Sequence, residues 1–288
     1  MATEKIKMRL QGHEKFPLRD GWLNKGLREV NQNEEAFIKK DAPDSFGIGS
    51  NMVKSLRYWM RALGLVDEKS GKAYLSQLGQ LVLDYDPYLE DPFSLWTMHI
   101  CIANNIGEAT SWYMYFNRCD AEELEKDQIV SILHREVIKY AQGQSFSDKS
   151  LMNDVDVLLS MYSKDKENDD PEDKNISPFA QLGLIRYRNG KYCKVRPDKR
   201  KIVVEVVLYY LALLLAGRDS MAIDTLINGE RGISKILHLS TIDANEFLDR
   251  LDSLGYIRVD RTAGIDMIYA INPLEAREVL ENYYNNRK

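Results

Sequence analysis

The sequence predicts a mainly α-helical fold of the α+β class, with small β-hairpins and with winged-helix-like units at both ends of a helical middle. This prediction depends on a pattern that occurs three times: a helix ends at a glycine, and a strand, a tight turn and a second strand follow. The copies begin at Leu63-Gly64, Leu182-Gly183 and Leu254-Gly255. Glycine readily adopts the left-handed conformation that ends many helices, and short turns that contain glycine join antiparallel strands. A helix that runs into a basic hairpin is typical of the second half of a winged helix.

Residues 1–83 are predicted to form a strand and a loop followed by the first winged-helix-like unit. Apolar and basic residues alternate over Ile6–Leu10, which is the period of a half-buried strand. A loop with glycine and proline follows, and residues 23–30 have the spacing of a short helix. The next helix begins at Ser50, and its apolar residues recur every three or four positions as far as Leu63. This helix leads directly into the first hairpin.

The rest of the chain divides into a helical middle and a mixed C-terminal part. Residues 84–163 are predicted to form an acidic helical bundle, and the polar run after them predicts a linker over 164–177. Residues 178–288 are predicted to combine a hairpin, a buried helix over 202–216 and a C-terminal winged-helix domain. Three helical segments precede the hairpin of that domain, whereas the middle copy of the pattern has only a short segment before it. We therefore interpret the middle copy as a hairpin alone.

The composition of the 288 residues excludes several classes of protein. The most apolar stretch, Ile202–Ala216, is shorter than the roughly 20 residues of a membrane span and contains Glu205. The first residues contain no apolar signal region, so we expect a cytoplasmic protein without membrane contact. The three scattered cysteines exclude a zinc ribbon and fit reduced thiols better than a disulfide framework. The chain contains no phosphate-binding loop, dinucleotide fingerprint or serine-hydrolase motif, so we expect no organic cofactor.

Charge is distributed unevenly along the chain, although the net charge is only −5. Residues 1–61 contain twelve Lys or Arg against eight Asp or Glu, and residues 186–201 contain eight basic residues against one acid. Residues 84–127 contain ten acids against two basic residues. This polarity suits a protein that presents one face to a polyanion, and ordinary solvated faces are the alternative interpretation.

The N-terminal basic region predicts a DNA-binding surface. The helix that begins at Ser50 has a basic side, and its start after two glycines can present backbone N–H groups to a phosphate. Further basic residues stand before this helix and in the second hairpin. The residues predicted to bind DNA are Lys15, Lys25, Ser50, Asn51, Lys54, Arg57, Arg61, Arg188 and Lys191. A solvated basic face is the alternative here too.

The last helix before the third hairpin has the opposite charge. It contains Asp243, Glu246, Asp249 and Asp252, whereas Arg250 is its one basic residue. An acidic helix repels phosphate, so the C-terminal unit is predicted to contact protein rather than DNA. Winged-helix hairpins also pair subunits in some proteins, which makes a homodimer one of the possible assemblies.

The loop near the N-terminus brings together residue types that bind phosphate or transfer protons. His13, Glu14 and Arg19 are the candidate catalytic residues, on the basis of residue type alone. A structurally satisfied histidine is the commoner role for an isolated His-Glu pair, so that alternative stays open.

Several of these residues also carry a family resemblance. Gly12-His13-Glu14-Lys15-Phe16-Pro17-Leu18-Arg19 and Gly21-Trp22-Leu23, followed by Phe46-Gly47-Ile48-Gly49-Ser50-Asn51, resemble a bacterial family catalogued as a domain of unknown function. Its members stand beside PAPS-reductase-like sulfur-transfer proteins. The resemblance extends through Pro178–Leu184 and the C-terminal unit. Within the family the chain looks most like the SspB-type components of Ssp DNA phosphorothioation systems.

The resemblance implies a DNA-acting subunit of a sulfur-modification and defence system, which works with sulfur-transfer and ATPase proteins and nicks one strand to admit sulfur. If Mg²⁺ or Mn²⁺ takes part, Glu14 can supply a ligand and Arg19 a cation that stabilises the pentavalent transition state. The competing hypothesis is a non-enzymatic adaptor or transcription-type regulator that binds DNA through its winged units.

Overall fold

Short helices and one hairpin form the N-terminal part of the computed structural model, which describes residues 6–163, 176–262 and 264–287. Helix α3 begins after Gly49. Because Val53, Leu56 and Met60 are spaced three or four positions apart, the helix has one apolar face, which it buries against the rest of this part. Strands β1 and β2 pair antiparallel from Val66 to Leu75. The elements are α1 (Trp22–Gln32), α2 (Ala42–Phe46), α3 (Ser50–Ala62), β1 (Val66–Lys69), β2 (Lys72–Leu75) and α4 (Gln77–Tyr85).

The middle of the chain is a helical bundle that contains the most deeply buried helix. This helix, α5, is buried on nearly all sides, from Phe93 to Ala103. Its apolar residues show no one-sided pattern because α6, α9 and the segment Pro178–Leu182 pack around it. The bundle consists of α5 (Pro92–Asn104), α6 (Thr110–Arg118), α7 (Lys126–Ala141) and α8 (Asp148–Ser163), with the two-residue strand β3 (Glu123–Leu124) between α6 and α7.

Two three-stranded antiparallel sheets follow. The first has the order β3-β5-β4, so a strand from the middle of the chain extends the second predicted hairpin. The second has the order β6-β8-β7 and packs against helices α10 and α12. The elements are η1 (Pro178–Leu182), β4 (Ile185–Arg188), β5 (Lys191–Lys194), η2 (Lys199–Lys201), α9 (Val204–Leu214), β6 (Ser220–Ala222), α10 (Ile223–Asn228), α11 (Ile233–Ile236), α12 (Thr241–Ser253), β7 (Ile257–Thr262), β8 (Ile265–Ala270) and α13 (Ala276–Asn285).

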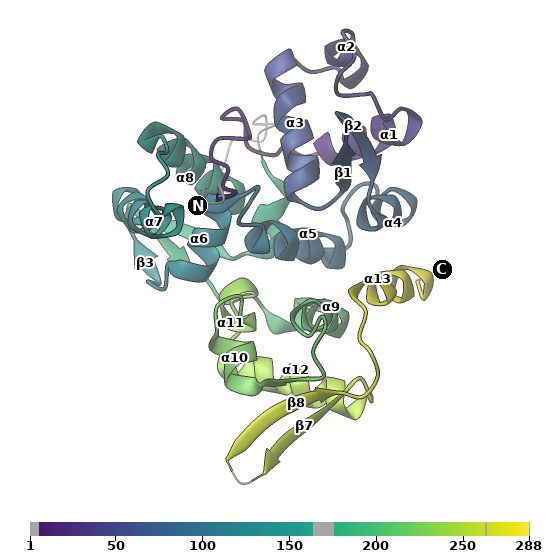
Figure 1. Cartoon of the computed structure of the whole chain (residues 1–288), viewed down its shortest axis with the longest axis vertical. Coiled ribbons are helices and arrows are strands. Elements are labelled where there is room, and N and C mark those ends of the chain that lie inside the picture. The colour runs from purple at the N-terminus through teal and green to yellow at the C-terminus, as the bar shows by residue number, and fades with distance from the viewer. Residues whose placement is uncertain (1–5, 164–175, 263, 288) are drawn as a thin grey trace, which may run out of the picture.

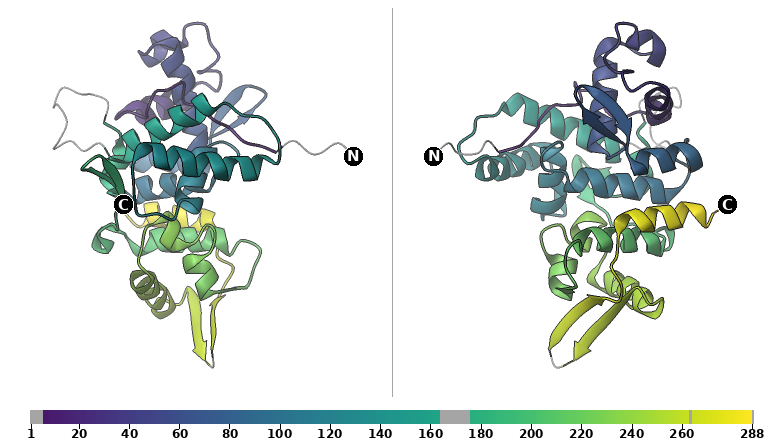
Figure 2. Two further views of the ribbon diagram at one scale, coloured as in Figure 1. Left: turned by 90° about the vertical axis from the view of Figure 1, so that its left-hand side faces the viewer. Right: turned by 45° about the vertical axis from the view of Figure 1, so that its right-hand side comes forward.

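The last helix, α13, packs against elements of the N-terminal part, the bundle and the C-terminal part. Figure 1 shows the N-terminal part at the top, the bundle at its lower left and the β7–β8 hairpin at the bottom, with α13 between the upper and lower parts. The ring of Tyr283 stacks on Phe93 of α5 at 3.7 Å between centroids, and Tyr284 shares a hydrogen bond with Ser94. Helix α13 also contacts α4 and α9. In both views of Figure 2 the β7–β8 hairpin projects from one end of the molecule.

The predicted α+β class is confirmed, since small antiparallel sheets stand among many helices. The strand predicted over Ile6–Leu10 is wrong, because this segment pairs with no strand. Its alternation arises instead from contact with the bundle, where the N–H of Arg9 donates to Thr110. Most of the predicted linker, residues 164–175, lies outside the described residues, and the predicted domain boundaries stay predictions. Within the described ranges no helix is long and apolar enough to cross a membrane.

Candidate nucleic-acid interface

His13 lies in the interior of the protein and has no exposed surface. Its Nε2 lies 2.8 Å from Oδ1 of Asp154, and its Nδ1 accepts the N–H of Lys15 at 3.1 Å. Since a nitrogen that accepts carries no proton, Nε2 is the protonated nitrogen and donates to the carboxylate. The imidazole also stacks on Trp59 with ring centroids 5.7 Å apart. Both nitrogens are therefore occupied, and the ring holds the N-terminal loop against the bundle.

Asp154 gathers further donors around the same carboxylate. Its Oδ1 also accepts the N–H of Gln11 at 2.7 Å, and its Oδ2 accepts the hydroxyl of Ser111 at 2.6 Å. Only 2% of Asp154 is exposed. A buried carboxylate is tolerated where several donors satisfy it, so this group connects the loop, α6 and α8.

Glu14 and Arg19, the other two candidate catalytic residues, do not form a site with His13. Glu14 is exposed on a left-handed turn at φ 49°. The guanidinium of Arg19 lies 5.4 Å from the ring centroid of Trp22, and its Nε is buried without a hydrogen-bond partner in the described structure. The described residues contain no group of three or more His, Cys, Asp or Glu side chains that fits a metal ion. Glu14 as a ligand of Mg²⁺ or Mn²⁺ stays a prediction, and we derive no step through a metal.

Two lysines lie near the start of α3, and a third lies beside the middle of the helix. The Nζ of Lys25 donates to the carbonyl of Phe46 at 3.4 Å, and the Nζ of Lys54 donates to Oδ1 of Asn51 at 3.3 Å. Lys15 is next to Phe16, whose carbonyl accepts hydrogen bonds from Ser55 and Trp59 of α3. We call this region the α3 entry surface and define it as Lys15, Lys25, Ser50, Asn51 and Lys54, all of which are exposed.

The α3 entry surface keeps its positive charge. Among the described residues, none of its three lysines forms an ion pair with a carboxylate. Gly49 precedes the first helical residue, Ser50, and offers no side chain that could cap the helix. The first backbone hydrogen bond of α3 is donated by the N–H of Val53 to the carbonyl of Gly49. The N–H groups of the first turn therefore face outward, where the helix dipole favours an anion. Four of the predicted DNA-binding residues, Lys25, Ser50, Asn51 and Lys54, lie near the start of α3, while Lys15 lies beside its middle.

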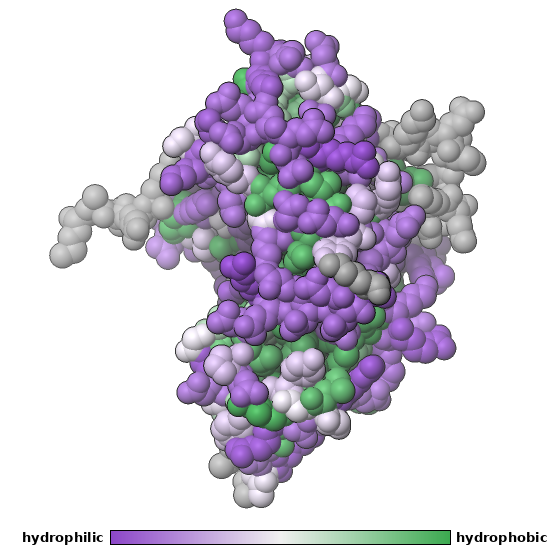
Figure 3. Space-filling view, turned by 90° about the vertical axis from the view of Figure 1, so that its right-hand side faces the viewer, coloured by the Kyte–Doolittle hydropathy of each residue, from purple (hydrophilic) through white to green (hydrophobic). Residues whose placement is uncertain are grey.

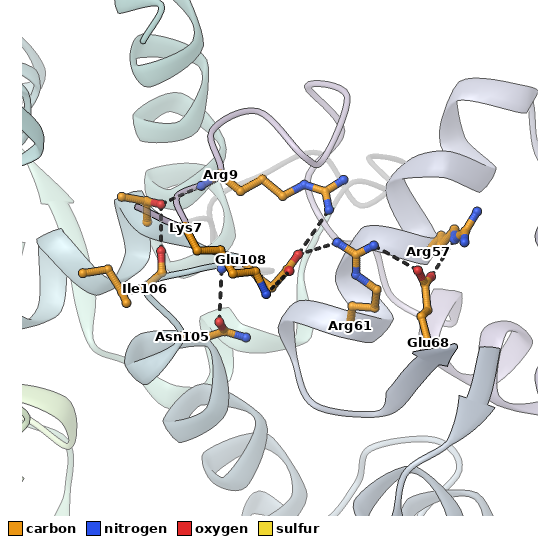
Figure 4. A network of polar contacts seen from close by, with 9 residues as sticks. Lys7, Arg9, Arg57, Arg61, Glu68, Asn105, Ile106 and Glu108 are labelled. Carbon is orange, nitrogen blue, oxygen red and sulfur yellow. Dashed lines mark hydrogen bonds and ion pairs between the residues drawn. The ribbon is translucent and has the colours of Figure 1, made fainter. Parts of the chain in front are cut away.

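Arg57 and Arg61, further along α3, are held differently. Arg57 donates to Glu68 at 2.6 Å, and Arg61 donates to both Glu68 and Glu108. Figure 4 shows that Lys7 and Arg9 reach Glu108 from the other side. Four cations thus surround two carboxylates, and this cluster keeps part of its positive charge. Burial would lower the pKa of Arg61, but the hydrogen bond to Glu108 and the nearby carboxylates raise it above its usual value.

Glu108 is expected to make the fold sensitive to acid. Burial would raise its pKa, but its contacts with Lys7 and Arg61 outweigh burial and lower the pKa below the usual value. A carboxylate of this kind stabilises the fold above its unfolded pKa, and the contribution is lost as the pH falls through the lowered value. We expect Glu108→Gln to reduce the free energy of unfolding at pH 7 by roughly 1–2 kcal/mol, and the difference to shrink below about pH 4.3.

Urea unfolding at pH 7 and at pH 3 measures this effect, with the exposed Glu90→Gln as a matched control. If Glu108→Gln and the natural protein differ in the free energy of unfolding by the same amount at pH 7 and at pH 3, Glu108 does not stabilise the fold through its ionised form.

Arg188 and Lys191, predicted as DNA contacts, are not part of the α3 entry surface. Lys191 of β5 forms an ion pair with Glu123 of β3 at 3.0 Å, while Arg188 is exposed at the end of β4. Figure 1 places β3 at the far side of the bundle from α3. The two basic segments of the sequence therefore do not converge on one face.

The sequence analysis missed a cleft that both basic and acidic residues line. It has a volume of about 680 Å³ and lies between β5, α11 and the start of α12. Lys194 and Lys235 line it, and both donate to carbonyls at the end of α6: Lys194 to Tyr115 at 3.2 Å and Lys235 to Asn117 at 2.9 Å. Cations at a helix C-terminus are stabilising, so both lysines have a structural role. The basic run over 186–201 indicated the positive charge of Lys194, but it did not indicate that carbonyls at the end of α6 accept its hydrogen bonds.

The architecture is that of a mainly helical α+β protein with small antiparallel sheets. The chain belongs to the family described as protein of unknown function (DUF4007), whose model matches residues 10–284. The family resemblance that the sequence predicted is thereby confirmed.

Two solved structures share the fold, one of SspB and one of magnesium-ion-bound SspB. Each is 24% identical to this chain and covers 96% of it and 88% of its own chain, with TM-scores of 0.86 and 0.85 respectively. No curated protein matches the chain. These likenesses show a common fold over nearly the whole length.

Proposed function

We propose that this protein is the DNA-binding, SspB-type component of a DNA phosphorothioation system and that the α3 entry surface contacts the DNA backbone. The observation that carries the proposal is the fold shared with SspB over 96% of the chain. Three lysines without ion-pair partners among the described residues supply the charge that phosphate contacts need. Sulfur-transfer and ATPase proteins of the same system are the proposed partners.

The order of elements supports the proposed winged-helix units. In the C-terminal part, α9, β6, α10 to α12, β7 and β8 follow one another, and β6 pairs with the last strand of the hairpin. This is the arrangement in which a helix and a hairpin stand on one side of a small domain. In the N-terminal part α3 precedes β1 and β2, so α3 is the proposed recognition helix and β1–β2 the proposed wing.

Nicking of one strand is a second candidate activity. The resemblance to SspB-type proteins implies it, and Glu14 favours it, since this carboxylate is exposed next to Lys15 on the α3 entry surface. His13 is no part of this candidate, because a ring with both nitrogens bonded and no exposed surface has no access to a phosphodiester. The rival hypothesis is an adaptor that binds DNA without cutting it.

One plasmid experiment tests both DNA binding and nicking. Supercoiled plasmid is incubated with the full chain in Mg²⁺ or Mn²⁺, and agarose gels report mobility and nicking. We expect retarded mobility that disappears at high salt, because phosphate contacts release counterions. Plasmid that is not retarded even at low salt would contradict DNA binding. Nicked circles that are lost in Glu14→Gln but kept in Asp44→Asn would support the nicking candidate, whereas retardation without nicking supports the adaptor.

A further inference from the structure

A cleft of about 490 Å³ lies in the C-terminal part, between α9, α13 and the start of β7. Its apolar floor is formed by side chains from both helices and from the segment that leads into α13. The cleft is separate from the α3 entry surface and from the residues proposed for nicking. The apolar lining residues are Val203, Leu208, Leu274 and Val279.

Large apolar side chains are exposed beside this cleft. Leu254 is 54% exposed, Tyr256 43% and Ile271 51%. They are neighbours, since the N–H of Ile271 donates to the carbonyl of Tyr256, which itself lines the cleft. Figure 3 shows apolar residues gathered on this side of the molecule over the C-terminal part. Contiguous exposed apolar surface next to a cleft is typical of a contact with another protein.

The rim of the cleft is acidic. Glu205, Glu275 and Glu278 line it, and none of them forms an ion pair with another described residue. The one basic lining residue, Arg287, is bonded to Asp91 outside the cleft. All three glutamates lie at the starts of α9 and α13, where the helix dipole favours acids, but that preference leaves their outward charge uncompensated.

We propose that this cleft docks an amphipathic, basic segment of a partner protein. Apolar side chains of the segment would fill the space over Val203 and Leu274, and its Lys or Arg side chains would meet the glutamates at the rim. Nucleic acid is repelled by the same carboxylates. The proposal is independent of DNA binding, because it uses neither α3 nor the N-terminal loop.

The probe is a fluorescein-labelled 14-residue helical peptide that has Leu on one face and Lys on the other. It is compared with a peptide in which Glu replaces each Lys. Fluorescence anisotropy with the full chain measures the affinity. We expect the Lys peptide to bind, and the Glu peptide to bind at least about tenfold more weakly. The variant Glu275→Gln/Glu278→Gln and the variant Leu254→Ser/Ile271→Ser are each expected to weaken binding of the Lys peptide about tenfold.

Asp67→Asn is the matched control, since Asp67 is an exposed carboxylate of β1 that does not line the cleft, and it should leave binding unchanged. Thermal unfolding of each variant separates lost binding from lost folding. Equal binding of both peptides, or equal effects of Asp67→Asn and the cleft variants, overturns the proposal. A dimer in sedimentation velocity that Leu254→Ser/Ile271→Ser dissociates would assign the surface to a second copy and overturn it as well.

Discussion

Replacing Asp154 by alanine is expected to lower the free energy of unfolding by about 4 kcal/mol, because three buried donors lose their acceptor together. These donors are the N–H of Gln11, Nε2–H of His13 and the hydroxyl of Ser111, at 2.6 to 2.8 Å. Gln11 and His13 belong to the N-terminal loop and Ser111 to α6, so none of the three finds a new partner without moving the loop away from the bundle. Asp154→Asn should cost less, since its carbonyl oxygen can still accept two donors while the hydroxyl of Ser111 rotates.

Urea unfolding followed by tryptophan fluorescence measures the difference, because Trp59 and Trp112 lie next to His13. The matched control is Asp156→Ala on the same helix. The carboxylate of Asp156 is 53% exposed and pairs with Lys126 at 3.0 Å, so its loss is expected to cost under about 1 kcal/mol. If Asp154→Ala and Asp156→Ala were equally stable, the buried network would not hold the loop.

This prediction changes how variants of His13 have to be interpreted. A catalytic histidine and a structural one both lose activity when replaced, but only the structural one lowers the unfolding free energy by several kcal/mol. The contacts and burial of His13 favour the structural role that the sequence analysis left open beside catalysis. Loss of activity in His13→Ala is therefore no evidence for catalysis unless the variant remains folded.

The elements that local signals define were predicted well. Helix α3 was expected to begin at Ser50 and does, because two glycines, a polar first turn and apolar residues three or four apart all favour that start. The three hairpins were found through the glycine that ends the preceding helix: Gly64, Gly183 and Gly255 all have positive φ. Such signals lie within a few residues of one another and need no tertiary context.

The missed elements depend on distant parts of the chain. Strand β3 has two residues and exists through its pairing with β5, about 70 positions away. Helix α13 did have a local signal in Val279, Leu280 and Tyr283, but its role in joining α4 and α5 follows from contacts with residues 77 and 94. No pattern within ten residues reveals partners of this kind.

At the candidate site, too, local features could be predicted from the sequence, whereas contacts with distant residues could not. Composition alone located the basic side of α3, but it did not separate free cations from paired ones. Arg61 is held by Glu108, 47 positions away, while Lys54 on the same helix donates to Asn51 and pairs with no carboxylate of the described residues. Two residues with one formal charge thus differ in the charge that they offer to a ligand, and only the folded arrangement distinguishes them.

That difference predicts which side chains dominate DNA binding. We expect the double variant Lys25→Ala/Lys54→Ala to weaken binding of a 20-base-pair duplex roughly tenfold at 0.1 M salt. Each lysine that neutralises a phosphate contributes about 0.9 to the slope of log K against log salt, so the slope should fall by about 1.8. Arg57→Ala is expected to have a smaller effect than Lys54→Ala, because Glu68 already neutralises part of the Arg57 charge.

Fluorescence anisotropy at several salt concentrations measures affinity and slope together. Lys72→Ala is the matched control, because Lys72 of the proposed wing pairs with Glu34 at 2.7 Å and Glu35 at 3.0 Å and offers little charge to DNA. The slope distinguishes a lost phosphate contact from a general loss of folding, since partial unfolding lowers the active fraction without changing the counterions that each bound molecule releases. If the slope is the same in the double variant, in Lys72→Ala and in the natural protein, the α3 entry surface does not contact the DNA backbone.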